Sequence, residues 1–321
     1  MIQRWARVLL LAGVVGSFVL SQFANRIDPY VVNVMMMIGI NMILAVSLNL
    51  VNGHTGQFSL GHAGFMAIGA YGSAAITLYA GEHLLRLAGG SSPLADAALL
   101  LLGLLVGGIA AALFGLIVGV PSLRLRGDYL AIVTLGFGEI IRVIIQNTDA
   151  LGGPRGMSGI PQLTTLFWTF ALACLTIYVI ASLVDSTYGR GFLAVRDDEV
   201  AAEAMGINTT KYKVTAFVLG AFFAGIAGGL YAHFITFITP EGFNFLKSVD
   251  VVVMVILGGM GSTLGVACAA LLLTVLNEFL RQFEQYRMIV FALLLIGMMI
   301  LRPQGLLGRF AGARSRRKSL T

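Results

Sequence analysis

Apolar stretches separated by short polar segments recur along the whole chain. A membrane-spanning helix needs about 20 mostly apolar residues. The runs that reach or approach this length are Val8–Phe23, Tyr30–Leu50, Phe58–Ala80, Ala95–Val120, Asp128–Ile145, Leu166–Val184, Val214–Ile238, Thr263–Leu280 and Tyr286–Leu301. One further run, Val249–Leu257, is short and ends at a glycine-rich break, 258–262. The pattern predicts an all-α polytopic membrane protein with about ten transmembrane helices, some of them broken or short.

Basic residues predict the orientation of these helices, because the cytoplasmic loops of membrane proteins are enriched in Lys and Arg. They gather in the N-terminal segment, in the loop 185–213 and in the tail 302–321. We therefore expect all three segments, and with them both termini, to be cytoplasmic. Termini on the same side require an even number of crossings, so the short run 249–257 is expected to be the tenth. The residues concerned are Arg4, Arg7, Arg190, Arg196, Lys211, Lys213, Arg302, Arg309, Arg314, Arg316, Arg317 and Lys318.

The composition excludes several other classes of protein. Hydrophobic residues make up 58% of the chain and charged residues 11%, whereas soluble domains average about 25% charged residues. The net charge of +6 is explained by cytoplasmic loops, so we expect no nucleic-acid binding. Cys174 and Cys268 lie inside apolar runs, and the four histidines lack ligand spacing, so we expect no disulfide and no metal site. No catalytic motif is present, and we expect neither catalytic residues nor an enzyme.

Pairs of small residues four positions apart predict close helix packing within the membrane. Gly103 and Gly107 form one such pair, and Gly225 and Gly229 form another.

The loop 185–213 predicts a short amphipathic helix on the cytoplasmic side. Its apolar residues Phe192, Val195 and Met205 recur at near-helical spacing, and Gly206 is a suitable C-terminal stop. Charged residues occupy the other faces; they include Arg196, Asp197, Glu199 and Glu203. The chain has no phosphate-binding loop of the Walker type, so an ATP-driven process would need its ATPase on another chain.

Two stretches are candidates for contact with a transported solute. The first, 52–65, is uncharged, polar and rich in glycine, and contains Gln57, Ser59 and His62. Irregular backbone at membrane depth either is buried in protein or lines a wet cavity, so a substrate path and an ordinary tight cytoplasmic turn both remain open. The second contains Glu139 and Arg142, three residues apart on one predicted helix. Such a pair either marks a functional interior site or forms a structural ion pair near the outer interface.

Several long motifs, in order along the chain, resemble the LivM-type permeases of the branched-chain amino acid ABC importers (LivHM permeases). They are Gly56–Tyr71, Gly127–Gly136, Gly153–Pro161, Ala194–Gly206 and Pro303–Leu307. The resemblance implies one permease domain, 1–321, in the bacterial inner membrane, which moves branched-chain amino acids or a similar small solute. It implies a heterodimer with a LivH-type permease, two cytoplasmic ATPase subunits that use ATP and Mg²⁺, and a periplasmic substrate-binding protein. No cofactor is expected on this chain.

The resemblance also assigns a role to the loop 185–213, which would dock on an ATPase as a coupling loop. Many ABC permeases carry Glu-Ala-Ala-x-x-x-Gly there, whereas here Val200 separates Glu199 from Ala201, so only the role of the loop is carried over. We expect Phe192, Val195 and Met205 to anchor it in a groove of the ATPase, and Gln57, Ser59 and His62 to line the solute path. The coupling residues would also include Arg196, Asp197, Glu199, Glu203 and Gly206.

Other functions remain open at this stage. Similar permeases carry urea, amides or aromatic acids. An ion-coupled secondary transporter is an alternative of another class, which would usually place acidic residues at mid-membrane. The sequence leaves undecided the substrate, the residues that line the cavity, pairing with itself or a paralogue, and the crossings around 243–280.

Overall fold

The computed structural model describes residues 2–23, 26–87, 92–122 and 128–283, with short pieces at 289–290, 292–293 and 296–297. Most of the predicted last span and the whole basic tail 302–321 lie outside these residues.

The described chain is almost entirely helical. Its α-helices are α1 (Ile2–Phe23), α2 (Pro29–Asn49), α3 (His62–Ala75), α4 (Gly81–Leu87), α5 (Pro93–Ser122), α6 (Asp128–Gln146), α7 (Leu166–Val184), α8 (Gly189–Asp197), α9 (Glu199–Ala204), α10 (Thr209–Ile235), α11 (Phe245–Gly258) and α12 (Thr263–Phe279). Two short strands, β1 (Met157–Ser158) and β2 (Phe237–Ile238), pair in antiparallel fashion. Single turns of π-helix (Leu50–His54, Ile76–Ala80) and of 3₁₀-helix (Asp149–Leu151, Gly153–Arg155, Pro240–Phe243, Leu280–Phe283) occur between them.

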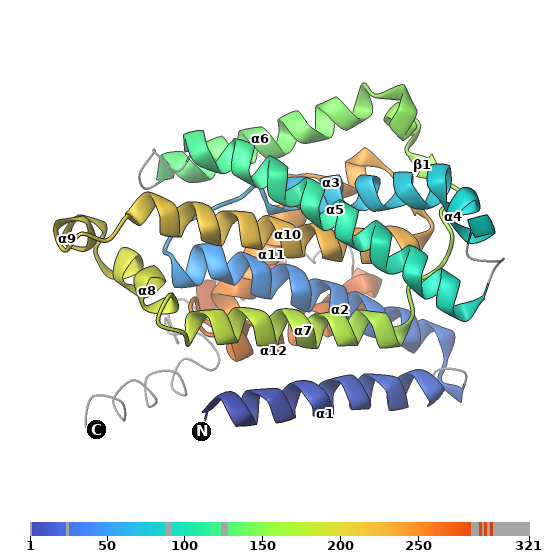
Figure 1. Cartoon of the computed structure of the whole chain (residues 1–321), viewed down its shortest axis with the longest axis horizontal. Coiled ribbons are helices and arrows are strands. Elements are labelled where there is room, and N and C mark those ends of the chain that lie inside the picture. The colour runs from blue at the N-terminus through green and yellow to red at the C-terminus, as the bar shows by residue number, and fades with distance from the viewer. Residues whose placement is uncertain are drawn as a thin grey trace.

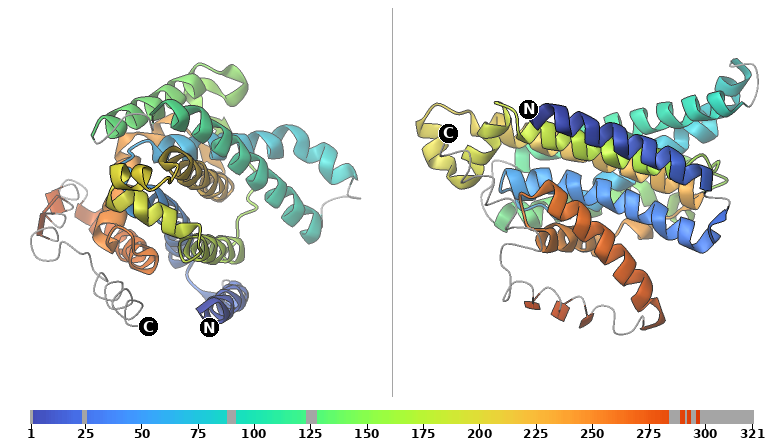
Figure 2. Two further views of the ribbon diagram at one scale, coloured as in Figure 1. Left: turned by 60° about the vertical axis from the view of Figure 1, so that its left-hand side comes forward. Right: turned by 90° about the horizontal axis from the view of Figure 1, so that it is seen from below.

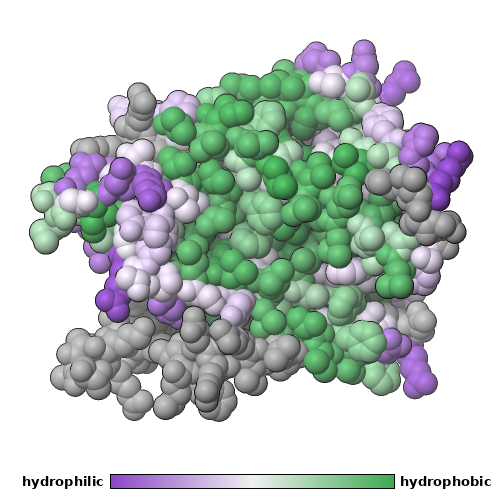
Figure 3. Space-filling view, viewed as in Figure 1, coloured by the Kyte–Doolittle hydropathy of each residue, from purple (hydrophilic) through white to green (hydrophobic). Residues whose placement is uncertain are grey.

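Six helical segments among the described residues are long and apolar enough to cross a membrane. They are Pro29–His54, His62–His83, Pro93–Ser122, Tyr129–Gln146, Leu166–Val184 and Thr209–Ile235. In Figure 3 a broad apolar belt covers the middle of the visible face, and hydrophilic side chains gather towards both ends. The prediction of an all-α polytopic membrane protein is confirmed, whereas ten crossings and cytoplasmic termini stay predictions.

The long helices lie side by side in one bundle (Figure 1), with α10 packed against α5, α3 and α2. Helix α1 lies at the edge of the bundle and packs on α7 (Figure 2). The start of α1 and the α8–α9 pair lie at the same end of the bundle, as the predicted orientation requires. We call this the α8–α9 end.

A seam of glycines lets α3, α5 and α10 approach one another closely. A Cβ atom added at Gly69 of α3 would lie 2.1 Å from the carbonyl oxygen of Gly225 in α10, and one added at Gly107 of α5 would lie 2.5 Å from that of Gly69. Small residues allow this approach because helices in lipid associate through van der Waals contact. The predicted packing role of Gly107 and Gly225 is confirmed.

The predicted span Phe58–Ala80 is wrong at its start, because the helix begins only at His62. The short apolar run 249–257 lies within α11, which begins four residues earlier at Phe245, and the predicted glycine break separates α11 from α12. Two hydrogen bonds join α11 to α2 and α2 to α12. Lys247 Nζ donates to Asn41 Oδ1 at 3.3 Å, and Asn41 Nδ2 donates to Thr274 Oγ1 at 3.0 Å.

Candidate functional site

Residues 55–61 form a non-helical break between the π-helical turn at the end of α2 and the start of α3. Side chains from three elements satisfy backbone amides that the break leaves without helical partners. The amide of Ser59 donates to Asn52 Oδ1 at 3.2 Å, that of Leu60 to Thr134 Oγ1 at 3.0 Å, and that of Ala63 to Ser248 Oγ at 3.1 Å. The break is therefore built into the protein, which is the condition under which irregular backbone is tolerated within a membrane.

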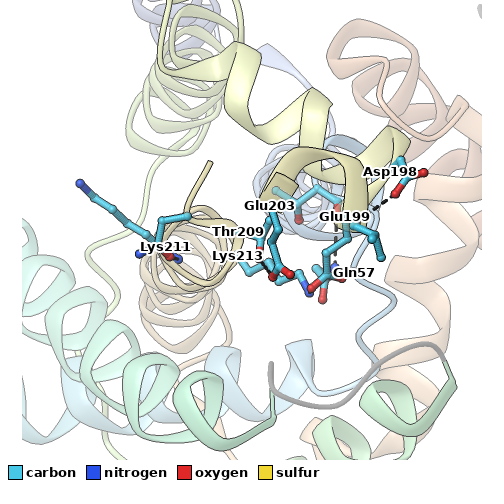
Figure 4. A network of polar contacts seen from close by, with 10 residues as sticks. Gln57, Asp198, Glu199, Glu203, Thr209, Lys211 and Lys213 are labelled. Atoms are coloured by element: carbon cyan, nitrogen blue, oxygen red, sulfur yellow. Dashed lines mark hydrogen bonds and ion pairs between the residues drawn. The ribbon is translucent and has the colours of Figure 1, made fainter. Parts of the chain in front are cut away.

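The three polar residues predicted for a solute path occupy different places. Ser59 and His62 are only 2% and 3% exposed, and His62 Nε2 lies 2.8 Å from Ser47 Oγ. Their polar groups are thus directed at other protein groups. Gln57 is half-buried at the α8–α9 end, in the cluster of polar side chains drawn in Figure 4. Whether these three residues contact a solute stays a prediction.

An open cleft of about 370 Å³ lies where α6 meets the segment that leads into α11. Helix α6 contributes two charged residues to it, Glu139 and Arg142, whose side chains form an ion pair with 2.7 Å between Arg142 Nη2 and Glu139 Oε2. The predicted ion pair is confirmed. Both side chains are partly exposed, Glu139 at 36% and Arg142 at 26%. The cleft is lined by Glu139, Arg142, Glu241, Asn244, Phe245 and Leu246.

A smaller hollow continues the cleft inward, since Glu139, Asn244 and Phe245 line both. Its other walls include Leu60 at the break and Ala63 at the start of α3. The charged cleft therefore leads to the broken helix, although Ser59 and His62 do not line it.

The loop 185–213 forms two short helices rather than the single helix predicted. The backbone turns at Asp198, whose side chain accepts from the amides of Val200 at 2.9 Å and Ala201 at 3.0 Å and so caps α9. Aspartate is a favoured N-cap residue, which explains why a new helix starts there. Gly206 adopts a positive φ of 82° just beyond α9, as expected of a helix stop.

The apolar residues of α8 face this chain's own interior. Phe192 is fully buried and Val195 is 3% exposed. The ring of Phe192 packs edge-on against Tyr188 and Tyr212, with centroids 5.5 and 5.6 Å away. The prediction that Phe192 and Val195 anchor in a partner's groove is therefore wrong, because they already anchor α8 to α10 and the rest of the bundle. Met205, in contrast, is 82% exposed.

Ionic and polar contacts fasten α9 to the start of α10 (Figure 4). Lys213 Nζ lies 2.5 Å from Glu199 Oε1, and Thr209 Oγ1 donates to Glu203 Oε1 at 2.7 Å. Arg196 forms an ion pair with its neighbour Asp197 at 3.0 Å. Glu199 and Glu203, two of the residues predicted for coupling to an ATPase, thus fasten α9 to α10 within this chain.

A sequence model of the family described as "Branched-chain amino acid transport system / permease component" matches residues 30–301. The chain belongs to this family. It is 42% identical over 236 residues to the high-affinity branched-chain amino acid transport system permease protein LivM of Salmonella typhimurium, covering 62% of this chain and 55% of the relative. LivM of Escherichia coli is 42% identical over 238 residues, which is 63% of this chain and 56% of that protein.

The second permease of that transport system is also similar to this chain. LivH of Escherichia coli is 31% identical over 157 residues, covering 47% of this chain and 49% of LivH. The chain spans about half the length of the curated relatives it matches. Among solved structures, a chain of PsaBC from Streptococcus pneumoniae in complex with Fab aligns at 15% identity and a TM-score of 0.32, covering 79% of this chain and 93% of that one.

The far wall of the cleft consists of residues that were not predicted from the sequence. Glu241 and Asn244 come from the turn between α10 and α11, about 100 residues after Glu139 in the chain. Asn244 caps α11 by accepting from the amide of Lys247, and its position just before the apolar run 249–257 was the available signal. Within the described part of the chain, no group of three or more His, Cys, Asp or Glu residues could hold a metal ion.

Proposed function

We propose that this chain is the membrane-spanning permease subunit of an ATP-driven importer of branched-chain amino acids. Membership of the family and the apolar helical bundle support this function. The importer would lie in the bacterial inner membrane with both termini of this chain in the cytoplasm. Its other parts would be a LivH-type permease, two ATPase subunits that bind ATP and Mg²⁺, and a periplasmic substrate-binding protein.

The cleft between α6 and α11 is the proposed entry for the solute. An amino acid carries both a carboxylate and an ammonium group, and the cleft offers the guanidinium of Arg142 together with the carboxylates of Glu139 and Glu241. Its volume falls within the about 300–1,000 Å³ typical of small-molecule sites. Phe245 and Leu246 add apolar surface for an aliphatic side chain. Paired charges of both signs favour a zwitterion over urea or an amide, and this is the observation that carries the assignment.

The α8–α9 end is the proposed docking site for an ATPase subunit. Val200 and Met205 are 63% and 82% exposed there, and exposed methionine and valine provide apolar anchors for a partner. Phe192 and Val195, being buried, would give α8 the rigid base through which the partner's movement is passed on.

Replacing Arg142 tests the cleft. In proteoliposomes that contain the complete importer, we expect Arg142→Gln to raise the KM for leucine uptake by about tenfold or more, because a bond to a charged group is worth about 1.5–3 kcal/mol. Arg86→Gln is the matched control, since Arg86 pairs with Glu82 on an exposed surface of α4, where the side chains are 77% and 84% exposed. An unchanged KM in Arg142→Gln would count against the cleft as the entry site.

Dependence on ATP tests the class of transporter. We expect uptake only when ATP and the ATPase subunits are present, and no effect of ionophores that collapse ion gradients. Uptake by this permease pair alone, driven by an ion gradient, would instead identify an ion-coupled secondary transporter.

A further inference from the structure

Arg196, in the last turn of α8, reaches from the α8–α9 pair to two separate breaks between helices. Its Cγ lies 3.1 Å from the position that a Cβ atom would occupy at Gly56, in the break between α2 and α3. Its Nη1 lies 3.0 Å from the corresponding position at Gly261, in the break between α11 and α12. One side chain therefore covers both breaks.

Both breaks turn on glycines that other residues replace only with strain. Gly56 has φ of 68° and Gly261 has φ of 86°, a region of backbone conformation that side chains with a Cβ rarely adopt. Gly56 and Gly261 also leave the space that Arg196 fills. The contact thus depends on glycine at both positions.

The two breaks are bound to each other beneath Arg196. Asn49 Oδ1 accepts from the amide of Gly261 at 2.9 Å, and His54 Nε2 lies 3.3 Å from Thr263 Oγ1. A Cβ at Gly53 would lie only 2.3 Å from the amide nitrogen of Gly261. The ends of α2 and α11 and the start of α12 thus meet in one tightly packed junction.

The junction lies between the α8–α9 pair and the proposed solute cleft. On one side, α8 is anchored by buried Phe192 and Val195. On the other side, the break that contains Gly56 leads to Leu60 and α3, and α11 carries Ser248; Leu60 and Ser248 both line the inner hollow of the cleft. A displacement of α8 would reach the walls formed by Leu60 and Ser248 through Arg196, whose side chain contacts both breaks.

We infer that Arg196 is a positioning residue that transmits movement of the α8–α9 pair to the breaks at Gly56 and Gly261. The inference rests on the proposed function, because it needs an ATPase that moves α8 and α9. Arg196 acts here through this chain's own helices, with its side chain 38% exposed, rather than as a contact with the ATPase.

The test measures uptake and ATP hydrolysis in the same proteoliposomes containing the complete importer. For Arg196→Ala we expect ATP hydrolysis within about twofold of wild type and solute uptake reduced about tenfold or more, so that fewer molecules enter per ATP hydrolysed. Arg196→Lys, which keeps a long stem and a positive charge, should restore at least about half of the uptake. Arg190→Ala is the matched control, because Arg190 is an exposed arginine of the same helix, and its uptake per ATP should equal that of wild type.

Each other outcome has a defined meaning. An unchanged uptake per ATP in Arg196→Ala overturns the inference, and so does a parallel fall of hydrolysis and uptake, which indicates an ATPase contact. If Arg196→Ala does not assemble, Arg196→Met, which keeps the stem over Gly56 and loses the guanidinium near Gly261, carries the same test. A wild-type assembly without ATP-driven uptake refutes the proposed function itself and is recognised before any variant is compared.

Discussion

Adding one methyl group at Gly69 should force α3 and α10 apart. The new Cβ would lie 2.1 Å from the carbonyl oxygen of Gly225 and 2.2 Å from its Cα, whereas carbon atoms pack best at about 3.5–4.0 Å. The two backbones would have to separate by more than about 1 Å at the centre of the glycine seam. Overpacking of this kind lowers the free energy of unfolding by about 1–3 kcal/mol and occasionally more. The higher helix propensity of alanine raises it by at most about 1 kcal/mol. We therefore expect Gly69→Ala to destabilise the protein by about 1–2 kcal/mol.

Gly72 provides a control on the same helix. A Cβ there would meet the Cα of Gly107 at 3.5 Å, an ordinary contact, so Gly72→Ala should be neutral or slightly stabilising. The assay is unfolding of the purified protein in mild detergent by increasing sodium dodecyl sulfate, followed by loss of helical circular dichroism. Gly69→Ala should unfold at a clearly lower fraction of dodecyl sulfate than both wild type and Gly72→Ala. Equal midpoints for the two alanine variants would refute the argument that backbone contact between α3 and α10 requires glycine.

Three further substitutions test other contacts. Asn41→Leu removes the hydrogen bonds of Asn41 to Lys247 and Thr274, each worth about 0.5–3 kcal/mol, so the midpoint in the dodecyl sulfate assay should fall. A midpoint equal to that of wild type would contradict this. Lys213→Met breaks the ion pair with Glu199, in which the Lys213 side chain is 2% exposed. Amide hydrogen exchange across residues 199–204 should therefore become faster. Unchanged protection from exchange would show that the ion pair does not hold α9 in place. Met205→Ser should change the free energy of unfolding by less than about 0.5 kcal/mol, because the side chain is exposed. It should, however, reduce co-purification of the proposed ATPase subunit. Undiminished co-purification would remove Met205 from the docking surface.

Features set by a single segment could be predicted from the sequence. Helix α7 occupies Leu166–Val184, the same residues as the predicted span, because the thickness of the membrane dictates the length of an apolar run. The ion pair of Glu139 and Arg142 was also accessible, since residues three apart share one face of a helix. The family resemblance was detectable because its motifs are continuous stretches of the chain.

Features that join distant segments could not be obtained in this way. Glu241 and Glu139 line one cleft only because the turn before α11 packs beside α6. The spacing of Phe192 and Val195 marked an apolar face of α8, but it did not tell whether that face meets a partner or the chain's own core.

The sequence by itself determined that this chain is a helical membrane protein of the branched-chain amino acid permease family, where most of its spans lie, and which residues pair locally. Only the tertiary structure decided which faces of those helices meet, where α2 and α3 are broken by residues 55–61, and that Arg196 lies on Gly56 and Gly261. The physical reason is that lipid and protein interior are about equally apolar. Hydrophobicity along the chain therefore marks what enters the membrane, whereas glycine contacts and polar partners from distant segments select the packing.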